Sequence, residues 1–88
     1  MDGATASPHR SGMEEEDVLI GLGRRICVLR RGMGLSQERF ALQAGLDRTY
    51  YAAIERGERN PSVKQLAKIA AALDMRIAAL FADEDIDG

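Results

Sequence analysis

The side chains best suited to chemistry lie between residues 47 and 60, and they are hydrogen-bond donors rather than catalytic groups. Successive residues of a helix turn by roughly 100°, so Tyr51 and Ile54 would share a buried side. The opposite side and its flanks would then carry a small, mostly polar set: Arg48, Thr49, Arg56, Ala52 and Ala53. Arginine can donate two parallel hydrogen bonds to guanine, and the methyl groups of threonine and alanine can contact thymine. On these residues alone, an ordinary exposed helix face explains the alanines equally well.

The segments around this face favour the more specific interpretation, because they predict a helix-turn-helix. Ser36 is a good N-cap for a first short helix, and Gly45 can adopt the left-handed conformation that ends it. Asp47 can cap the second helix, and Gly57 can close it. Two helices joined by so short a turn lie at a steep angle, which lets the second helix enter the major groove of DNA. The residues predicted to read base edges are Arg48, Thr49, Ala52 and Ala53.

Hydrophobic periodicity extends the prediction to a compact all-α fold of five helices. The first is expected over about 17–31, where apolar residues recur three and four positions apart. The fourth begins at Ser62 with a capping-box pattern, and a short fifth helix is expected near 75–81. The expected organisation is a disordered acidic tail over 1–16, a DNA-binding domain over 17–82 and an acidic tail over 83–88.

Length and composition narrow the class of protein. A chain of 88 residues with 45% apolar content can bury one small core, and we expect no second domain. Cys27 is the single cysteine, which excludes an intrachain disulfide and a cysteine-based metal site. The apolar runs are too short to span a bilayer, and the N-terminus has no secretory pattern. We therefore expect a cytoplasmic protein, associated with the nucleoid and not with a membrane.

The net charge of −2 conceals an uneven distribution. Between Val18 and Arg76 the chain has eleven basic and five acidic side chains, a net charge of +6, whereas the two ends together carry −8. Because salt screens charges beyond about 10 Å, the local excess decides what a surface attracts. The basic central segment is therefore compatible with phosphate binding, and a solvated basic surface is the simpler alternative.

No group of residues in the sequence supports catalysis or cofactor binding. His9 is the single histidine and lies in the expected tail. The acids from Glu14 to Asp17 are typical of a helix start, where the helix dipole favours negative charge, rather than of a cation site. Nucleotide-binding, zinc-protease and serine-hydrolase motifs do not occur in the sequence. We therefore expect a protein that is not an enzyme and that needs no cofactor and no metal.

Several residue groups in the central segment stand at fixed spacing: Leu35-Ser36-Gln37-Glu38, Ala41, Gly45-Leu46, Ile54-Glu55-Arg56-Gly57 and Arg59-Asn60-Pro61. In these groups the chain resembles the Cro and phage-repressor (XRE-type) helix-turn-helix family. The resemblance covers about 22–81 and implies a lambda-repressor-like fold. Within the family, the segment from Asp47 to Tyr50, followed by that from Ile54 to Gly57, is most similar to the controller proteins of restriction-modification systems. Those proteins are homodimers that bind paired operator sites and regulate endonuclease and methyltransferase genes.

The resemblance implies DNA contacts beyond the predicted reading face. The positions that match phosphate, backbone or loop contacts are Gln37, Tyr50, Arg56, Arg59, Asn60 and Lys64. Gln37 stands at the start of the first helix of the motif, and Arg59 in the loop after the second. The family also places opposite charges where Arg30 and Glu55 stand, which implies a structural ion pair.

The chain departs from the family at three places. Tyr51 stands where isoleucine or valine is usual, so a buried phenol must find a partner for its hydroxyl. Ala53 replaces a polar reader of some relatives, which places more of the specificity on Arg48 and on DNA shape. The segment 74–76 stands where a glycine and a serine-like cap are common, which weakens the start of the fifth helix.

Apolar residues near the C-terminus predict an interface. Ile77, Leu80 and Phe81 recur at three- to four-residue spacing, beyond what one small core needs. We expect them to join two chains in a homodimer, whose symmetry would place two reading helices in successive major grooves. The expected partners are thus double-stranded operator DNA, a second copy of the chain and, for a regulator, RNA polymerase. The alternative function is that of an antitoxin or another protein-binding module with the same fold.

Overall fold

Four α-helices and one short 3₁₀ helix make up the computed structural model, which describes residues 14–81. They are α1 (Glu15–Gly32), α2 (Gln37–Ala44), α3 (Arg48–Glu55), α4 (Val63–Ala72) and the 3₁₀ helix η2 (Ile77–Phe81). No strand occurs in this range, and the all-α prediction is confirmed. The expected fifth α-helix is corrected to a 3₁₀ helix that begins at Ile77. Helix α1 begins two residues inside the predicted tail 1–16, with Glu14 as its N-cap, and residues 1–13 and 83–88 of the predicted tails lie outside the described residues.

The helix ends form at the polar residues that the sequence indicated. Ser36 Oγ accepts the N–H of Arg39 at 3.1 Å, and Asp47 Oδ2 accepts the N–H of Tyr50 at 2.9 Å. Ser62 and its partner three residues later form the complete capping box of α4. Each cap satisfies an N–H group that the first helical turn cannot bond internally. These local bonds fix where α2, α3 and α4 begin.

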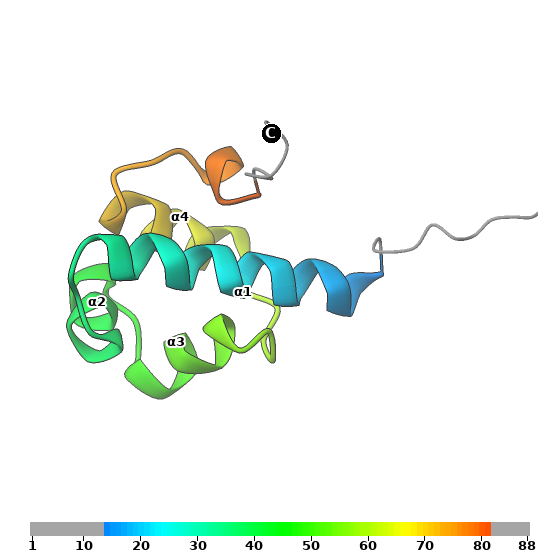
Figure 1. Ribbon diagram of the computed structural model, residues 1–88, viewed down its shortest axis with the longest axis horizontal. Coiled ribbons are helices and arrows are strands. Elements are labelled where there is room, and N and C mark those ends of the chain that lie inside the picture. Colours follow the sequence, from blue (N-terminus) through cyan, green and yellow to red (C-terminus); the bar gives the residue numbers. More distant parts are fainter. Residues whose placement is uncertain (1–13, 82–88) are drawn as a thin grey trace, which may run out of the picture.

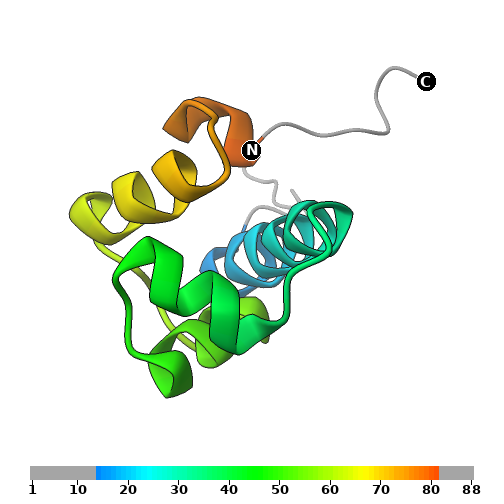
Figure 2. The same cartoon turned by 90° about the vertical axis from the view of Figure 1, so that its left-hand side faces the viewer.

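The helices pack around α1, which crosses the middle of the molecule (Figure 1). Helix α3 lies on one side of α1, and α4 and η2 lie on the other, whereas α2 connects the two sides. Figure 2 looks nearly along α1 and shows the same separation of α3 from η2. The largest fully buried side chains fill the space between them: Tyr51, Phe40, Ile26, Ile54, Ile69 and Leu80. Helix α3 is thus held on the outside of the molecule by a core that its own Tyr51 and Ile54 help to form.

Two glycines let the backbones of α1 and α3 approach each other. A Cβ atom at Gly23 would lie 2.5 Å from the carbonyl oxygens of Ile54 and Glu55. Gly57 ends α3 with φ +77°, and a Cβ atom at this residue would lie 2.9 Å from the Cα of Ile20. Both distances are far below van der Waals contact, so a larger residue would push the end of α3 away from α1. The C-terminal end of the predicted reading helix is therefore positioned by close backbone packing.

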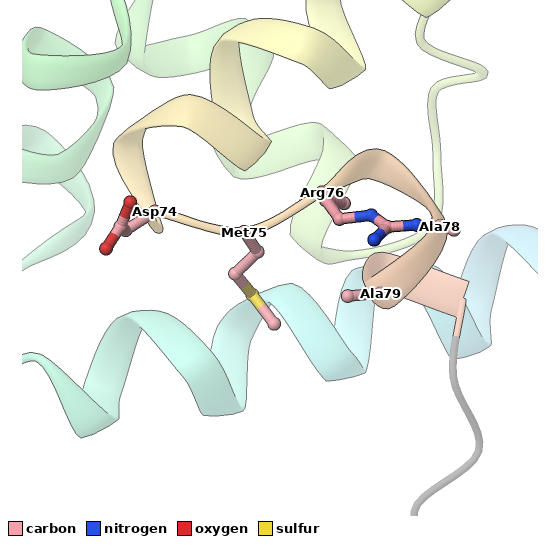
Figure 3. A pocket seen from close by; sticks show the side chains of 5 residues that line it. All are labelled: Asp74, Met75, Arg76, Ala78 and Ala79. Atoms are coloured by element: carbon pink, nitrogen blue, oxygen red, sulfur yellow. The ribbon is translucent and has the colours of Figure 1, made fainter.

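Helix α4 ends in a motif that normally uses glycine. Asp74 has φ 59°, in the left-handed region, and its N–H donates to Ala71 O at 3.0 Å. The N–H of Met75 donates to Ala70 O at 2.9 Å, which completes a Schellman motif. Figure 3 shows the Met75 side chain turned toward α1, with Asp74 pointing elsewhere. The motif turns the chain back, so that η2 can pack against α1.

Candidate nucleic-acid interface

Helix α3 presents a small exposed face formed by Arg48, Thr49 and Ala52. Arg48 and Thr49 are exposed, and Ala52 is half-buried. Arg48 is the first residue of the helix, directly after its Asp47 cap. The N-terminal turn of a recognition helix is the part that contacts base edges. One long donor in that turn, beside two short side chains, suits close approach to the major groove.

Ala53, which the sequence placed on the flank of this face, is buried. It is only 7% exposed. It lies one helical turn after Tyr50, whose hydroxyl donates to Gln65 Oε1 at 2.6 Å. A buried methyl group cannot contact a base edge. The expectation of an exposed Ala53 is therefore wrong, and Ala53 is removed from the candidate reading face.

The side chain of Gln65 connects α4 to the rim of the reading helix. Its Oε1 accepts the N–H of Ser62 at 3.0 Å as well as the hydroxyl of half-buried Tyr50. One amide therefore caps α4 and holds Tyr50 in place. The sequence indicates Gln65 only as a cap, because no local pattern predicts that a side chain of α3 reaches it. Lys64 in the same turn of α4 is exposed, as a phosphate contact must be.

The loop between α3 and α4 carries the other charged candidates. Arg56 Nε lies 3.0 Å from Glu58 Oε1 in an exposed ion pair. Such a pair contributes less than about 1 kcal/mol, so a phosphate can compete for Arg56. Arg59 is exposed, and Asn60 Nδ2 donates to Glu15 Oε2 at 3.2 Å. This last contact joins the loop to the first turn of α1, which the sequence did not indicate.

Gln37 lies at the N-terminal end of α2, where a helix favours negative charge. The N–H groups of this first turn have no carbonyl partner within the helix. Together with the helix dipole they make such an end suitable for a phosphate. The half-buried side chain of Gln37 also turns inward, since its Nε2 donates to Glu55 Oε1 at 2.8 Å. Gln37 is thus a candidate contact for a DNA phosphate and is at the same time bonded to the buried carboxylate of Glu55.

Behind the interface, Arg30 of α1 and Glu55 of α3 form the ion pair that the resemblance implied. Arg30 Nε lies 2.7 Å from Glu55 Oε2, and its Nη2 lies 3.0 Å from Oε1. The two side chains are only 8% and 4% exposed. The hydroxyl of Tyr51 donates to Oε2 as well, so Glu55 is the partner that this phenol required. Arg30 Nη1 also donates to the carbonyl of Leu35 at 2.8 Å, which fixes the approach to α2.

These contacts determine the charge of each member of the cluster. Burial alone would raise the pKa of Glu55, but hydrogen bonds from Arg30, Tyr51 and Gln37 outweigh it and lower that pKa to about 2. The bond to Glu55 raises the pKa of Arg30 above its ordinary value. Burial, reinforced by the hydrogen bond to Glu55, raises the pKa of Tyr51. At neutral pH the cluster is therefore an anion surrounded by one cation and two neutral donors.

The three apolar residues expected at a dimer interface do not share one surface. Phe81 is 49% exposed and Ile77 is half-buried, but Leu80 is only 1% exposed. Leu80 belongs to the core, where η2 packs against α1 and α4. A side chain buried so deeply in its own chain cannot contact a second one. Leu80 is therefore removed from the predicted interface, which rests on Ile77 and Phe81.

A protein-family model described as helix-turn-helix matches residues 29–80, more than half of the chain. The chain belongs to the XRE-type helix-turn-helix family. It is 47% identical over 68 residues to the control protein C.MunI of a Mycoplasma species, covering 76% of this chain and 92% of that protein. It also resembles the restriction-modification controller protein C.AhdI from Aeromonas hydrophila, with 46% identity and a TM-score of 0.70. That match covers 72% of this chain and 96% of C.AhdI.

The crystal structure of a third relative includes its operator DNA. The controller protein C.Esp1396I, as a tetramer bound to its natural 35 base-pair operator, is 34% identical to this chain with a TM-score of 0.66. The match covers 73% of this chain and 84% of that protein. The family is one of transcriptional regulators and not of enzymes.

Among residues 14–81, no group of three or more His, Cys, Asp or Glu side chains could hold a metal ion. Within the same range, no helix is both long and apolar enough to span a membrane. The segment after α4 and the first residues of η2 line a pocket, with Asp74, Met75, Arg76, Ala78 and Ala79 around it (Figure 3). These residues lie at and just before η2, which is across α1 from α3 (Figure 1), so they are separate from the candidate interface.

Proposed function

We infer that this chain is a transcriptional regulator that binds double-stranded operator DNA sequence-specifically as a homodimer, with α3 in the major groove. The observation that carries the inference is the exposed face of α3, where Arg48 follows the cap with short side chains beside it. Gln37, Tyr50, Arg56, Arg59, Asn60 and Lys64 are assigned to the DNA backbone or to the adjacent loop contact. Membership of a family of DNA-binding regulators supports the same function.

We further propose that the chain is a restriction-modification controller. Its similarity to C.MunI and C.AhdI, each covered over more than nine-tenths of its length, supports this assignment. A controller would act in the cytoplasm on the promoters of an endonuclease and a methyltransferase. Contact with RNA polymerase and association with the nucleoid stay predictions of this assignment.

The test begins with selection of bound sequences from random duplex DNA. Affinity for a selected duplex and for its scrambled version is then measured at several salt concentrations for wild type, Arg48→Ala and Arg59→Ala. Losing a bidentate base contact costs roughly 1–3 kcal/mol, so Arg48→Ala should lower the ratio of selected to scrambled affinity. Losing a charged phosphate contact should weaken both duplexes alike and reduce the salt slope by about one unit for Arg59→Ala.

Arg76→Ala is the matched control, because Arg76 is exposed and directly precedes η2, which lies across α1 from α3 (Figure 1). It should leave the affinity ratio and the salt slope unchanged. An unchanged ratio in Arg48→Ala would mean that α3 does not read bases through this residue. If wild type prefers none of the selected sequences, the DNA-reading function fails and the alternative of an antitoxin or other protein-binding module takes its place.

A further inference from the structure

The carboxylate of Glu55 accepts hydrogen bonds from three helices. Its Oε2 accepts Arg30 Nε of α1 and the Tyr51 hydroxyl of α3. Its Oε1 accepts Arg30 Nη2 at 3.0 Å and Gln37 Nε2 of α2 at 2.8 Å. A carboxylate offers about four lone-pair positions, so these four bonds use all of them. Of the four donor groups, only the amide of Gln37 belongs to the candidate DNA interface.

The charge of Glu55 determines which end of the Gln37 amide turns inward. An ionised carboxylate only accepts hydrogen bonds, so Gln37 must present its NH₂ group and not its carbonyl. One N–H of that group is bonded to Glu55, which leaves the second N–H for another acceptor. A DNA phosphate is also an acceptor only. The same nitrogen can therefore bridge a buried carboxylate and a phosphate.

We propose that Glu55 is a positioning residue for DNA binding: it orients the Gln37 side chain so that one Nε2 hydrogen is held inside and the other is directed to a backbone phosphate. This inference rests on the proposed function, in which Gln37 contacts that phosphate. Because Arg30 bonds both oxygens of the buried carboxylate, the orientation is set before DNA arrives. The Gln37 amide of the DNA-free protein therefore loses little rotational freedom on binding, which increases the affinity for the phosphate without any additional contact.

The first test is ethylation interference on a selected duplex, with wild type, Gln37→Ala, Glu55→Gln and Tyr51→Phe, each checked for folding by circular dichroism. Ethylation of the phosphate that Gln37 contacts should interfere with wild type and not with Gln37→Ala. The same interference should disappear in Glu55→Gln, with roughly tenfold weaker binding in both variants. The double variant with Gln37→Ala and Glu55→Gln should bind no more weakly than either single variant, because both substitutions remove the same phosphate contact. Tyr51→Phe removes a donor from the other oxygen of the same carboxylate and should keep the interference.

The outcomes separate this inference from the function on which it rests. If wild type binds no duplex specifically, the proposed function fails. If Gln37→Ala keeps every interference, Gln37 is not the phosphate contact, although DNA binding stands. If Gln37→Ala loses one phosphate and folded Glu55→Gln keeps it, Glu55 does not position Gln37 and the proposal is overturned.

A second measurement decides the question in wild type, even where Glu55→Gln fails to fold. The Gln37 side-chain amide gives two proton signals in a nitrogen–proton NMR spectrum, identified by their absence in Gln37→Ala. Adding the selected duplex should shift one proton signal and leave the other, bonded to Glu55, in place. Movement of both signals, or their averaging by rotation, would show that the amide is not held and would overturn the proposal.

Discussion

At the scale of single residues, Glu55 makes stability depend on pH. Its pKa is lowered from 4.5 to about 2 in the folded protein by hydrogen bonds that outweigh burial. A depressed acid pKa stabilises the fold fully above the unfolded value, and this stability is lost as pH falls from about 4.5 to about 2. The shift corresponds to roughly 3 kcal/mol. We therefore expect the free energy of unfolding to fall steeply in this range.

Urea unfolding of wild type and Glu55→Gln at several pH values between 7 and 2.5 checks this expectation. The variant should be less stable at neutral pH and should lose much less stability on acidification. Glu58→Gln is the matched control, because Glu58 is exposed and pairs with exposed Arg56. Parallel acid limbs for wild type and Glu55→Gln would mean that other carboxylates cause the acid sensitivity.

The residues around Glu55 also show which side-chain contacts could be predicted from the sequence and which could not. The pairing of Arg30 with Glu55 followed from the family pattern of opposite charges. The hydroxyl of Tyr51 was expected to need a partner that was not named, although Glu55 stands four residues later on the same helix, where two side chains are neighbours. The prediction for Ala53 was wrong for a different reason: helical periodicity gives the angle of a side chain, but not whether another part of the chain covers that angle.

At the scale of elements, two nearby glycines of α1 should respond in opposite ways to alanine. Gly21 is exposed with no atom within 4 Å of a Cβ, whereas a Cβ at Gly23 would meet two carbonyl oxygens of α3 at 2.5 Å. Gly21→Ala should stabilise by roughly 0.5–1 kcal/mol, since alanine favours the helix. Gly23→Ala should destabilise by about 3 kcal/mol, because backbone atoms cannot give way easily. Chemical denaturation of both variants tests this, and a similar effect at the two positions would contradict the close approach of α1 and α3.

The end of α4 gives a second prediction at this scale. Asp74 adopts a left-handed conformation in which glycine is the least strained residue. Asp74→Gly should therefore stabilise slightly, by less than about 1 kcal/mol, because aspartate tolerates this conformation better than most residues. Asp74→Ala is the control and should destabilise, since it keeps the Cβ and loses the polar side chain. Thermal unfolding distinguishes the two, and a stabilising Asp74→Ala would show that this turn carries no strain.

Most element boundaries were predictable, because the caps are local. Ser36, Asp47 and Ser62 each bond an N–H three residues ahead, so the signal and the structure lie in the same few residues. The 3₁₀ form of η2 was not predictable from its apolar spacing. Helix η2 is bonded to distant α1, where Arg25 Nε donates to Ala79 O at 2.8 Å. Such long-range bonds leave no local pattern in the sequence.

At the scale of the whole molecule, the question is how two copies of the chain meet. A reading helix on one side of α1 and η2 on the other would let a dimer through η2 keep both reading helices free for DNA. Of the predicted interface residues, Phe81 is half exposed and Ile77 is half-buried, whereas Leu80 lies in the core. The sequence identified the segment correctly as apolar, but spacing alone could not divide it between core and surface.

This division makes the dimer prediction testable with two neighbouring substitutions. Phe81→Asp should leave a folded chain of 9.6 kDa that sediments as a monomer at concentrations where wild type has twice that mass. The physical reason is that two charges would face each other across an apolar, two-fold interface. Leu80→Asp should instead unfold the chain, because it places a charge in a site that is only 1% exposed. Sedimentation equilibrium with circular dichroism separates the two effects. If folded Phe81→Asp keeps the dimer mass, the interface lies elsewhere, and the exposed apolar side chains Val28, Leu42 and Val63 become the next positions to change.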